Sequence, residues 1–300
     1  MTKPTLYMTI GLPGSGKTEW AKSTGHKVFS SDAIREELGD VNDQNQNNKV
    51  FEILHKRVKD ALCAGESCVY DATNVASKRR RAFLNEIRRF DCIKTAVMFI
   101  VDPDILRERN KSRERQVPGE VISRMLHRLQ PPVDSEGWDS ICSFIVRGSA
   151  DPLQLYSDMD QANSHHSLTL MEHSELAEKL ALKKARSAGL SSSRTHCLQT
   201  AAYYHDVGKY WTRTFKDSRG YPTMEAHYYN HENVGAYMYL LAGDEASIDH
   251  DLYTSALIAW HMRPYVWDKE PQVKENDRKW MKPWFIEDLE ILHEADMEAH

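Results

Sequence analysis

A glycine-rich loop with a lysine and a threonine has the residue types that hold a phosphate. The apolar run 6–10 leads directly into Gly-Leu-Pro-Gly-Ser-Gly-Lys-Thr over residues 11–18. Glycines let backbone N–H groups converge on an oxyanion, Lys17 can reach the β- and γ-phosphates of a nucleotide, and the Thr18 hydroxyl can bind magnesium. An ordinary glycine-rich turn would not need a lysine at this spacing. The sequence therefore predicts a nucleotide site formed by Gly11, Pro13, Gly14, Ser15, Gly16, Lys17 and Thr18.

Two further polar groups follow predicted strands in the first half. Asp32 and Arg35 are three residues apart and would share one face of a helix. Asp32 could then accept the proton of an attacking hydroxyl while Arg35 holds a substrate phosphate. Asp71, Thr73 and Asn74 follow the next strand, at the edge where open parallel sheets bind ligands. There Asp71 could assist the magnesium while the other two orient the acceptor, although helix caps and turns would explain both groups equally well.

An arginine-rich segment over residues 107–115 precedes a Val-Pro pair. Such a segment can close over a triphosphate and stabilise the charge that develops on the transferred phosphoryl group. Glu108 and Glu114 also permit the alternative of a solvated helix face.

A different chemistry is concentrated in the second half. Lys and Arg number 24 against 20 Asp and Glu before residue 151, but 15 against 24 after it, where 11 of the 14 histidines lie. His205 and Asp206 end an apolar helical pattern, and adjacent imidazole and carboxylate groups there can turn toward one metal ion. A lone His-Asp pair means little, but this one lies in a series with His173, His231, His261 and Asp296. The second half therefore predicts a metal site.

Strands and helices alternate in the first half, which predicts an α/β domain with a parallel sheet flanked by helices. The second half carries helical patterns, and the stretch 148–164 lacks periodicity, so we expect domains at 1–150 and 151–300, the second all-α. The expected strands are 6–10, 28–31, 67–70, 95–101 and 141–146, and the expected helices are 19–22, 32–38, 49–64, 78–90, 103–112, 120–129, 174–187, 195–204, 231–241, 252–261 and 283–299.

Composition excludes a membrane protein and suggests a compartment. No apolar run approaches the roughly 18 residues that a membrane helix requires, and 300 residues suffice for two domains. The five cysteines are odd in number and form no close ligand pair. Reduced thiols of this kind are typical of the cytoplasm, where we expect the protein to be located.

The four motifs of the first half, taken together and in this order, resemble the P-loop kinases of the phage-type 5′-hydroxyl polynucleotide kinase family over about residues 5–146. The resemblance implies that Lys17 and Thr18 bind the phosphates and Mg²⁺ of ATP or another nucleoside triphosphate. It also implies that Asp32 is the general base, and that Arg35 and Asp71 hold the acceptor phosphate and the geometry of the site. Arg113 would be the lid arginine, although this lid is one residue shorter than in that family, which leaves Arg115 open.

The histidine and aspartate series resembles the HD-superfamily metal-dependent phosphohydrolases over about residues 160–299. The resemblance implies one or two divalent transition metals, which could be Mn, Fe, Ni, Co or Zn. His173, His205, Asp206 and Asp296 would bind the first metal. His231 and His261 would admit a second metal bridged by Asp206, with Lys209 and His166 close to the substrate phosphate.

Together the resemblances imply an enzyme that repairs nucleic-acid ends. The first domain would phosphorylate 5′-hydroxyl ends of RNA or DNA. The second would remove 2′, 3′ or 2′,3′-cyclic terminal phosphates, so that a ligase could act next. One alternative is a small-molecule or nucleoside kinase fused to a nucleotide phosphohydrolase. Another is a nucleotide-sensing module with a non-catalytic helical domain. The sequence does not determine an oligomeric state.

Overall fold

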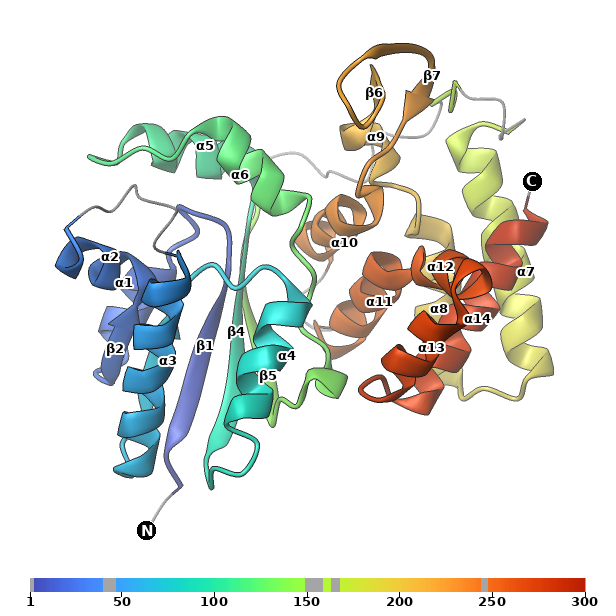
Figure 1. The fold of residues 1–300 in the computed structure, drawn as a ribbon. Helices are drawn as coiled ribbons and strands as arrows, with labels where there is room; N and C mark the ends of the chain where they lie inside the picture. The colour runs from blue at the N-terminus through green and yellow to red at the C-terminus, as the bar shows by residue number, and fades with distance from the viewer. Residues whose placement is uncertain (1–2, 40–46, 149–158, 163–167, 244–247, 300) are drawn as a thin grey trace. The chain divides into compact units, whose positions relative to one another are not determined.

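The computed structural model describes residues 3–39, 47–148, 159–162, 168–243 and 248–299. The chain divides into two compact units (Figure 1). The first comprises residues 1–122 and 132–146, and the second comprises residues 123–131 and 147–300. The domain boundary that we predicted at residue 150 lies outside the described residues, so it remains a prediction.

The first unit is a five-stranded parallel sheet with helices against its faces, as expected. The strand order is β2-β3-β1-β4-β5. Nearly continuous burial along β3 and β4 explains why both strands read as apolar runs without alternation. The strands are β1 (Thr5–Gly11), β2 (Lys27–Ser30), β3 (Cys68–Asp71), β4 (Ile93–Val101) and β5 (Ser140–Val146), and the helices are α1 (Lys17–Ser23), α2 (Ser31–Glu37), α3 (Asn47–Cys63), α4 (Ser77–Glu86) and α5 (Pro103–Lys111). Helix α6 (Gly119–Leu126) begins in the first unit and ends in the second.

The strand order places the predicted motifs at one edge of this sheet. Strand β1 pairs in parallel with β3, where Leu6 lies opposite Cys68. On its other side β1 pairs in parallel with β4, where Leu6 lies opposite Lys94. The glycine-rich loop leaves the carboxyl end of β1, and Asp71 is the last residue of β3 beside it. The two loops therefore emerge next to each other, where parallel sheets bind ligands.

The second unit is a helical domain. Buried Ala177, Ala181 and Ala185 follow one face of α7 and leave room for close packing against α8 and α14. The helices are α7 (Leu170–Ser187), α8 (Ser192–Tyr204), α9 (Lys209–Thr212), α10 (His231–Ala242), α11 (Ile248–Trp260), α12 (Arg263–Lys269), α13 (Pro271–Arg278) and α14 (Pro283–Glu298).

Three helices of this unit, α9, α12 and α13, and one β-hairpin were not predicted. An antiparallel hairpin of β6 (Thr214–Lys216) and β7 (Pro222–His227) stands between α9 and α10. Its strands are short and its side chains do not alternate cleanly between apolar and polar, so no strand signal is present. Helix α7 begins four residues earlier than expected because Thr169 and Glu172 form a capping box.

No helix among the described residues is long and apolar enough to cross a membrane.

Candidate functional sites

The glycine-rich loop surrounds the ammonium group of Lys17. Gly14 and Gly16 have φ angles of 84° and 94°, which side-chain-bearing residues rarely adopt. Helix α1 begins at Lys17, whose Nζ donates to the Leu12 carbonyl at 2.7 Å and to Ser15 Oγ at 3.3 Å. Burial lowers the pKa of Lys17 to about 8, against the attraction of neighbouring carboxylates. The loop therefore holds a buried cation at the N-terminus of a helix, a ready site for a phosphate.

Asp71 and Thr18 face each other beside this loop. The Thr18 hydroxyl donates to Asp71 Oδ2 at 2.9 Å, and Thr9 Oγ1 donates to Asp71 Oδ1 at 3.2 Å. Asp71 is only 3% exposed. A hydroxyl and a fixed carboxylate are hard oxygen ligands of the kind that Mg²⁺ prefers, so the residues present fit the predicted ion.

Asp32 and Arg113 also approach the loop. Asp32 lies in the first turn of α2, which is capped by Ser30 accepting the Asp32 N–H at 3.3 Å. The carboxylate of Asp32 favours the charged form of Lys17, while the guanidinium of Arg113 disfavours it, so both side chains lie within range of the ammonium. The role of Arg113 as the lid arginine remains a prediction.

Arg35 lies below the surface of the same unit. It is 8% exposed, and its Nη2 donates to Asn47 Oδ1 at 2.5 Å. Its Nη1 is buried and has no hydrogen-bond partner among the residues that the structure describes. A buried guanidinium nitrogen without a partner is costly, which suits a group that meets an anion when substrate binds.

A residue that the sequence analysis missed holds the loop after β3. Arg80 is 1% exposed and pairs with buried Glu136, whose Oε1 accepts from Arg80 Nη2 at 2.6 Å. Arg80 Nη1 also donates to the Asn74 carbonyl at 2.9 Å, and Asn74 Nδ2 donates to the Thr9 carbonyl at 2.8 Å. The adjoining carbonyl of Thr73 accepts the Gly11 N–H at 3.0 Å. Arg80 belongs to a run of basic residues that reads as a solvated helix face, so only its burial reveals this role.

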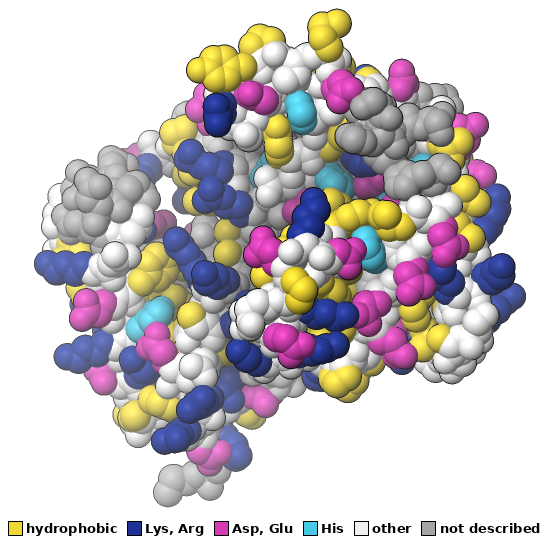
Figure 2. Space-filling view, turned by 45° about the vertical axis from the view of Figure 1, so that its right-hand side comes forward, with side chains coloured by type: hydrophobic (Ala, Val, Ile, Leu, Met, Phe, Trp, Pro, Cys, Tyr) yellow, Lys and Arg dark blue, Asp and Glu magenta, His cyan; other side chains and the backbone are white. Residues whose placement is uncertain are grey.

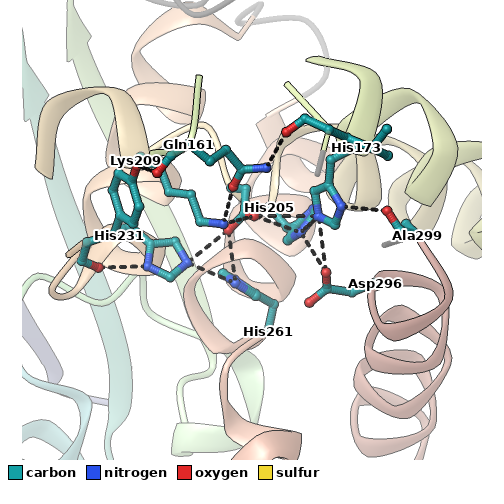
Figure 3. A network of polar contacts seen from close by, with 12 residues as sticks. Gln161, His173, His205, Lys209, His231, His261, Asp296 and Ala299 are labelled. Atoms are coloured by element: carbon teal, nitrogen blue, oxygen red, sulfur yellow. Dashed lines mark hydrogen bonds and ion pairs between the residues drawn. The ribbon is translucent and has the colours of Figure 1, made fainter. Parts of the chain in front are cut away.

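Four imidazoles meet in the second unit, each with its Nε2 atom turned toward another of the four (Figure 3). In each ring, Nδ1 lies within hydrogen-bond distance of a backbone carbonyl. A carbonyl oxygen can only accept, so Nδ1 carries the proton and the Nε2 atom of each neutral ring keeps its lone pair. The pairs are His173 with Ala299 at 3.0 Å, His205 with Ala202 at 2.7 Å, His231 with Tyr228 at 2.9 Å and His261 with Ile258 at 2.8 Å.

The Nε2 atoms face one another in two pairs. His173 and His205 have their Nε2 atoms 3.2 Å apart, as do His231 and His261. Asp296 Oδ1 lies 3.2 and 3.3 Å from the first two Nε2 atoms. Two lone pairs at this distance repel unless a proton or a metal ion lies between them, and two imidazoles with a carboxylate are a donor set that fits divalent metals.

Asp206 connects the two histidine pairs. Its Oδ2 lies 3.5 Å from His173 Nε2 and 3.4 Å from His205 Nε2, while its Oδ1 lies 3.0 Å from His231 Nε2 and 3.8 Å from His261 Nε2. The ligand atoms fall into two groups, one of His173, His205 and Asp296 and one of Asp206, His231 and His261. One carboxylate facing both groups is the arrangement expected of a bridging ligand in a two-metal site.

The electrostatics of this centre also favour a cation. Burial alone would lower the pKa of His205, but Asp206 and Asp296 outweigh it and raise that pKa to about 10. Burial and the neighbouring imidazoles of His205 and His231 lower the pKa of His261 to about 3. Burial would raise the pKa of Asp206, yet Lys209 and His205 hold it well below its ordinary value. The carboxylates therefore remain charged and attract positive charge.

Residues around the ligands fix them in place. Lys209 Nζ lies 2.6 Å from Asp206 Oδ2 and 2.8 Å from Gln161 Oε1 (Figure 3). Tyr265 OH donates to Asp296 Oδ2 at 2.8 Å. Gln161 and Tyr265 were not predicted, because the first lies in the stretch without periodicity and the second in a helix without a clear signal. His166, a predicted substrate contact, lies outside the described residues.

Two glycines let the elements of this centre approach. A Cβ on Gly208 would lie 1.9 Å from the His231 carbonyl oxygen and 2.6 Å from the Gly235 backbone nitrogen. Gly208 follows Asp206 by two residues, and Gly235 lies one turn along α10 from His231. This backbone contact brings the two ligands together.

The fold and the two sites define a chain that joins a P-loop phosphotransfer domain to a helical domain with an imidazole–carboxylate centre. Residues 6–132 match the family model of the AAA domain, and residues 165–296 match that of the HD domain. The chain therefore carries a P-loop kinase domain followed by an HD domain. Kinases of this kind use a nucleoside triphosphate with Mg²⁺, and HD domains bind divalent metals.

Three known proteins each resemble part of the chain. The L-seryl-tRNA(Sec) kinase of Methanococcus maripaludis is 25% identical over 143 residues, which cover 45% of this chain and 56% of that protein. The chain thus spans about half the length of this curated relative. A putative kinase from Chloroflexus aurantiacus is 21% identical with a TM-score of 0.40, over 48% of this chain and 86% of that one. A chain of the Pnkp1/Rnl/Hen1 RNA repair complex is 17% identical with a TM-score of 0.38, over 43% and 45%.

Proposed function

We propose that the chain is a bifunctional enzyme that repairs the ends of RNA or DNA. Its first domain transfers the γ-phosphoryl group of a nucleoside triphosphate to a 5′-hydroxyl. Its HD domain removes 2′, 3′ or 2′,3′-cyclic terminal phosphates. The observation that carries this proposal is the presence of two separate sites for phosphate chemistry, one around Lys17 and one around Asp206, in the same chain.

Each polar group around Lys17 has its own role in the proposed kinase reaction. Thr18 and Asp71 would hold Mg²⁺, which neutralises charge on the β- and γ-phosphates when bound. Asp32 takes the proton of the 5′-hydroxyl as its oxygen attacks the γ-phosphorus. The bond to the β-phosphate oxygen breaks, and the nucleoside diphosphate leaves. Arg113 stabilises the charge on the transferred group.

Arg35 supports a polynucleotide acceptor over a small alcohol. A 5′-hydroxyl terminus brings a backbone phosphate one nucleotide away from the attacking oxygen, whereas a small alcohol brings none. The buried Nη1 of Arg35, without a partner among the described residues, suits such a phosphate.

The HD domain supports hydrolysis of a terminal phosphate. Metals held by His173, His205, Asp206, His231, His261 and Asp296 would lower the pKa of a water and neutralise a phosphate ester. Lys209 holds Asp206 at 2.6 Å and supplies a further positive charge for the substrate phosphate. The products, a 5′-phosphate and a free hydroxyl end, are those that a ligase joins. The five unpaired cysteines fit a cytoplasmic location.

The tRNA-linked acceptor of the curated relative supplies a second candidate for the kinase half. The likeness to an L-seryl-tRNA(Sec) kinase would place a serine hydroxyl on a tRNA in the acceptor position. That acceptor also carries nucleic acid, but it is phosphorylated at an amino-acid side chain rather than at a 5′ end.

A labelled oligonucleotide tests the proposal at both ends at once. We expect a strand with a 5′-hydroxyl and a 2′,3′-cyclic phosphate to gain γ-phosphate at one end and lose phosphate at the other. The products are resolved separately, with a nucleoside, a sugar and seryl-tRNA as competing acceptors. Label on any of these, with none on the oligonucleotide, would contradict the polynucleotide assignment.

Two variants separate the activities. Lys17→Ala removes the cation that binds the triphosphate, so we expect at least a 100-fold loss of 5′ phosphorylation and little change in phosphate removal. His205→Ala removes a metal ligand and should have the converse effect. If either variant lost both activities to the same degree, a single shared site would replace the proposal.

A further inference from the structure

The residues just before and just after the β6–β7 hairpin contact residues of the metal centre. Helix α9 begins with Lys209, which contacts Asp206, and leads directly into β6. Strand β7 ends at His227, and the next residue, Tyr228, accepts a hydrogen bond through its carbonyl from His231 Nδ1. A molecule bound along the hairpin therefore lies next to the centre.

One side of the hairpin is fixed to the unit. Ala226 is 5% exposed, and its N–H donates to the Ala162 carbonyl at 2.9 Å. In the turn, Asp217 Oδ1 accepts the N–H groups of Arg219 and Tyr221 at 2.9 and 2.8 Å. These two hydrogen bonds hold the carboxylate of Asp217 inside the turn.

The rest of the hairpin, and the residues that flank it within 210–229, expose large apolar side chains. Of the ten such side chains exposed in the described part of the chain, five fall within residues 210–229. In Figure 2, hydrophobic side chains gather at the top, over the hairpin. Single exposed apolar residues are ordinary, but a concentration of this kind marks an interaction surface. The five are Tyr210 (40% exposed), Phe215 (46%), Tyr221 (66%), Met224 (96%) and Tyr229 (39%).

Cations accompany these rings in a half of the chain that is otherwise acidic. The guanidinium of Arg213 lies 5.3 Å from the centre of the Phe215 ring, and Lys216 and Arg219 follow in the same hairpin, against the carboxylates of Asp217 and Glu225. Residues 151–300 as a whole carry 15 basic side chains against 24 acidic ones. Rings on which bases stack, with cations for the phosphates between them, are how proteins bind single-stranded nucleic acid.

We propose that the β6–β7 hairpin is a platform on which terminal bases of single-stranded RNA or DNA stack while the terminal phosphate reaches the metal centre. This inference rests on the proposed function of the HD domain. It adds the element that would distinguish a polynucleotide end from a small phosphate ester.

The test compares two substrates in the full-length, metal-loaded protein. A single-stranded 3′-phosphorylated oligonucleotide can use the hairpin, whereas p-nitrophenyl phosphate reports on the metal centre alone. For Phe215→Ala/Tyr221→Ala we expect KM for the oligonucleotide to rise about tenfold or more, the usual loss for a stacked base. The ratio of kcat/KM for the oligonucleotide to that for p-nitrophenyl phosphate should fall by the same factor.

Trp284→Ala is the matched control. Trp284 is 45% exposed and also carries a cation, since Lys282 Nζ lies 4.9 Å from the ring centre. It lies on α14, roughly 18 Å along the helix from Asp296. If exposed aromatic rings in general bound the strand, this variant would lower the ratio as well, which would overturn the assignment to the hairpin.

The other outcomes are distinct. An unchanged oligonucleotide KM in the double variant, with the wild type active on that substrate, would overturn the platform and leave the proposed function standing. An equal fall for both substrates would make the hairpin a structural support of the centre and also overturn it. A wild type that cleaves p-nitrophenyl phosphate but not the oligonucleotide would contradict the proposed function itself.

Discussion

At the residue scale, both sites fix a functional nitrogen through backbone carbonyls. The Leu12 carbonyl accepts from Lys17 Nζ, and four carbonyls accept from the imidazole Nδ1 atoms of the metal centre. These contacts set the direction of each group before any ligand arrives. Such preorganisation matters because groups that need not reorient during the reaction stabilise its charges more strongly.

Tyr265 is expected to tune metal binding without contacting the metal. Its hydroxyl donates to Asp296 Oδ2 at 2.8 Å, so Tyr265→Phe frees that carboxylate to rotate. Loss of such a supporting contact typically costs about 10- to 100-fold in metal affinity. We expect a loss in this range when the metal-free protein is titrated with Mn²⁺. Tyr210→Phe, at a ring 40% exposed, is the control; equal affinities for both variants would exclude the role.

A site residue could be predicted only where its type and its spacing in the sequence indicate its chemistry. Lys17, Asp71 and Asp206 carry chemistry in their type and spacing, so the sequence pointed to them. Gln161 and Arg80 act through burial and through contacts across 48 and 56 residues of chain, respectively. Neither feature is present in any local pattern, so the sequence could not reveal them.

At the element scale, the close contact between Gly208 and α10 determines whether His231 can lie beside Asp206. A Cβ at residue 208 would lie 1.9 Å from the His231 carbonyl, which is backbone and cannot move aside alone. Gly208→Ala should therefore push α10 away and separate His231 from Asp206.

We expect Gly208→Ala to lose most of its bound metal and its phosphate-removing activity while 5′ phosphorylation persists. Metal content by mass spectrometry and the two activities measure this. Gly119→Ala is the matched control, because nothing lies within 4 Å of the added carbon and its φ is not positive. Full metal content in Gly208→Ala would show that α10 can shift without loss of the ligands.

Elements were predictable where one face is continuously buried. The strands of the parallel sheet and helices such as α7, with its row of buried alanines, carry that signal. The β6–β7 hairpin and α13 do not. Helix α13 buries only Asp277, which accepts from Arg263 and Trp267, so it is held by polar contacts that no hydrophobic period reports.

At the scale of the whole molecule, the two units contain their sites separately. The ligands of the metal centre all belong to the second unit, whereas Lys17, Asp32 and Asp71 belong to the first. Each unit also buries its own core. Ligands should therefore stabilise the two units independently.

Metal removal should lower the stability of the second unit alone. Without metal, two buried carboxylates and the Nε2 lone pairs of His173, His231 and His261 lie close together. Because its pKa is about 10, His205 holds a proton at neutral pH, and this proton offsets part of the charge. We expect a stable but weakened unit. A metal at about 100 times its Kd contributes ~2.7 kcal/mol, and each kcal/mol shifts Tm by roughly 2–4 °C for a unit of this size. Calorimetry with and without dipicolinate should show one transition falling by roughly 5–10 °C.

The other transition provides the internal control. If the proposed function is right, ATP with Mg²⁺ binds the first unit and raises the transition that dipicolinate leaves in place. Lys17→Ala should abolish that rise without altering the metal-dependent transition, because its ammonium lies in the glycine-rich loop. If chelation and nucleotide moved a single common transition instead, the two units would unfold as one. The separate effects expected of Lys17→Ala and His205→Ala would then fail as well.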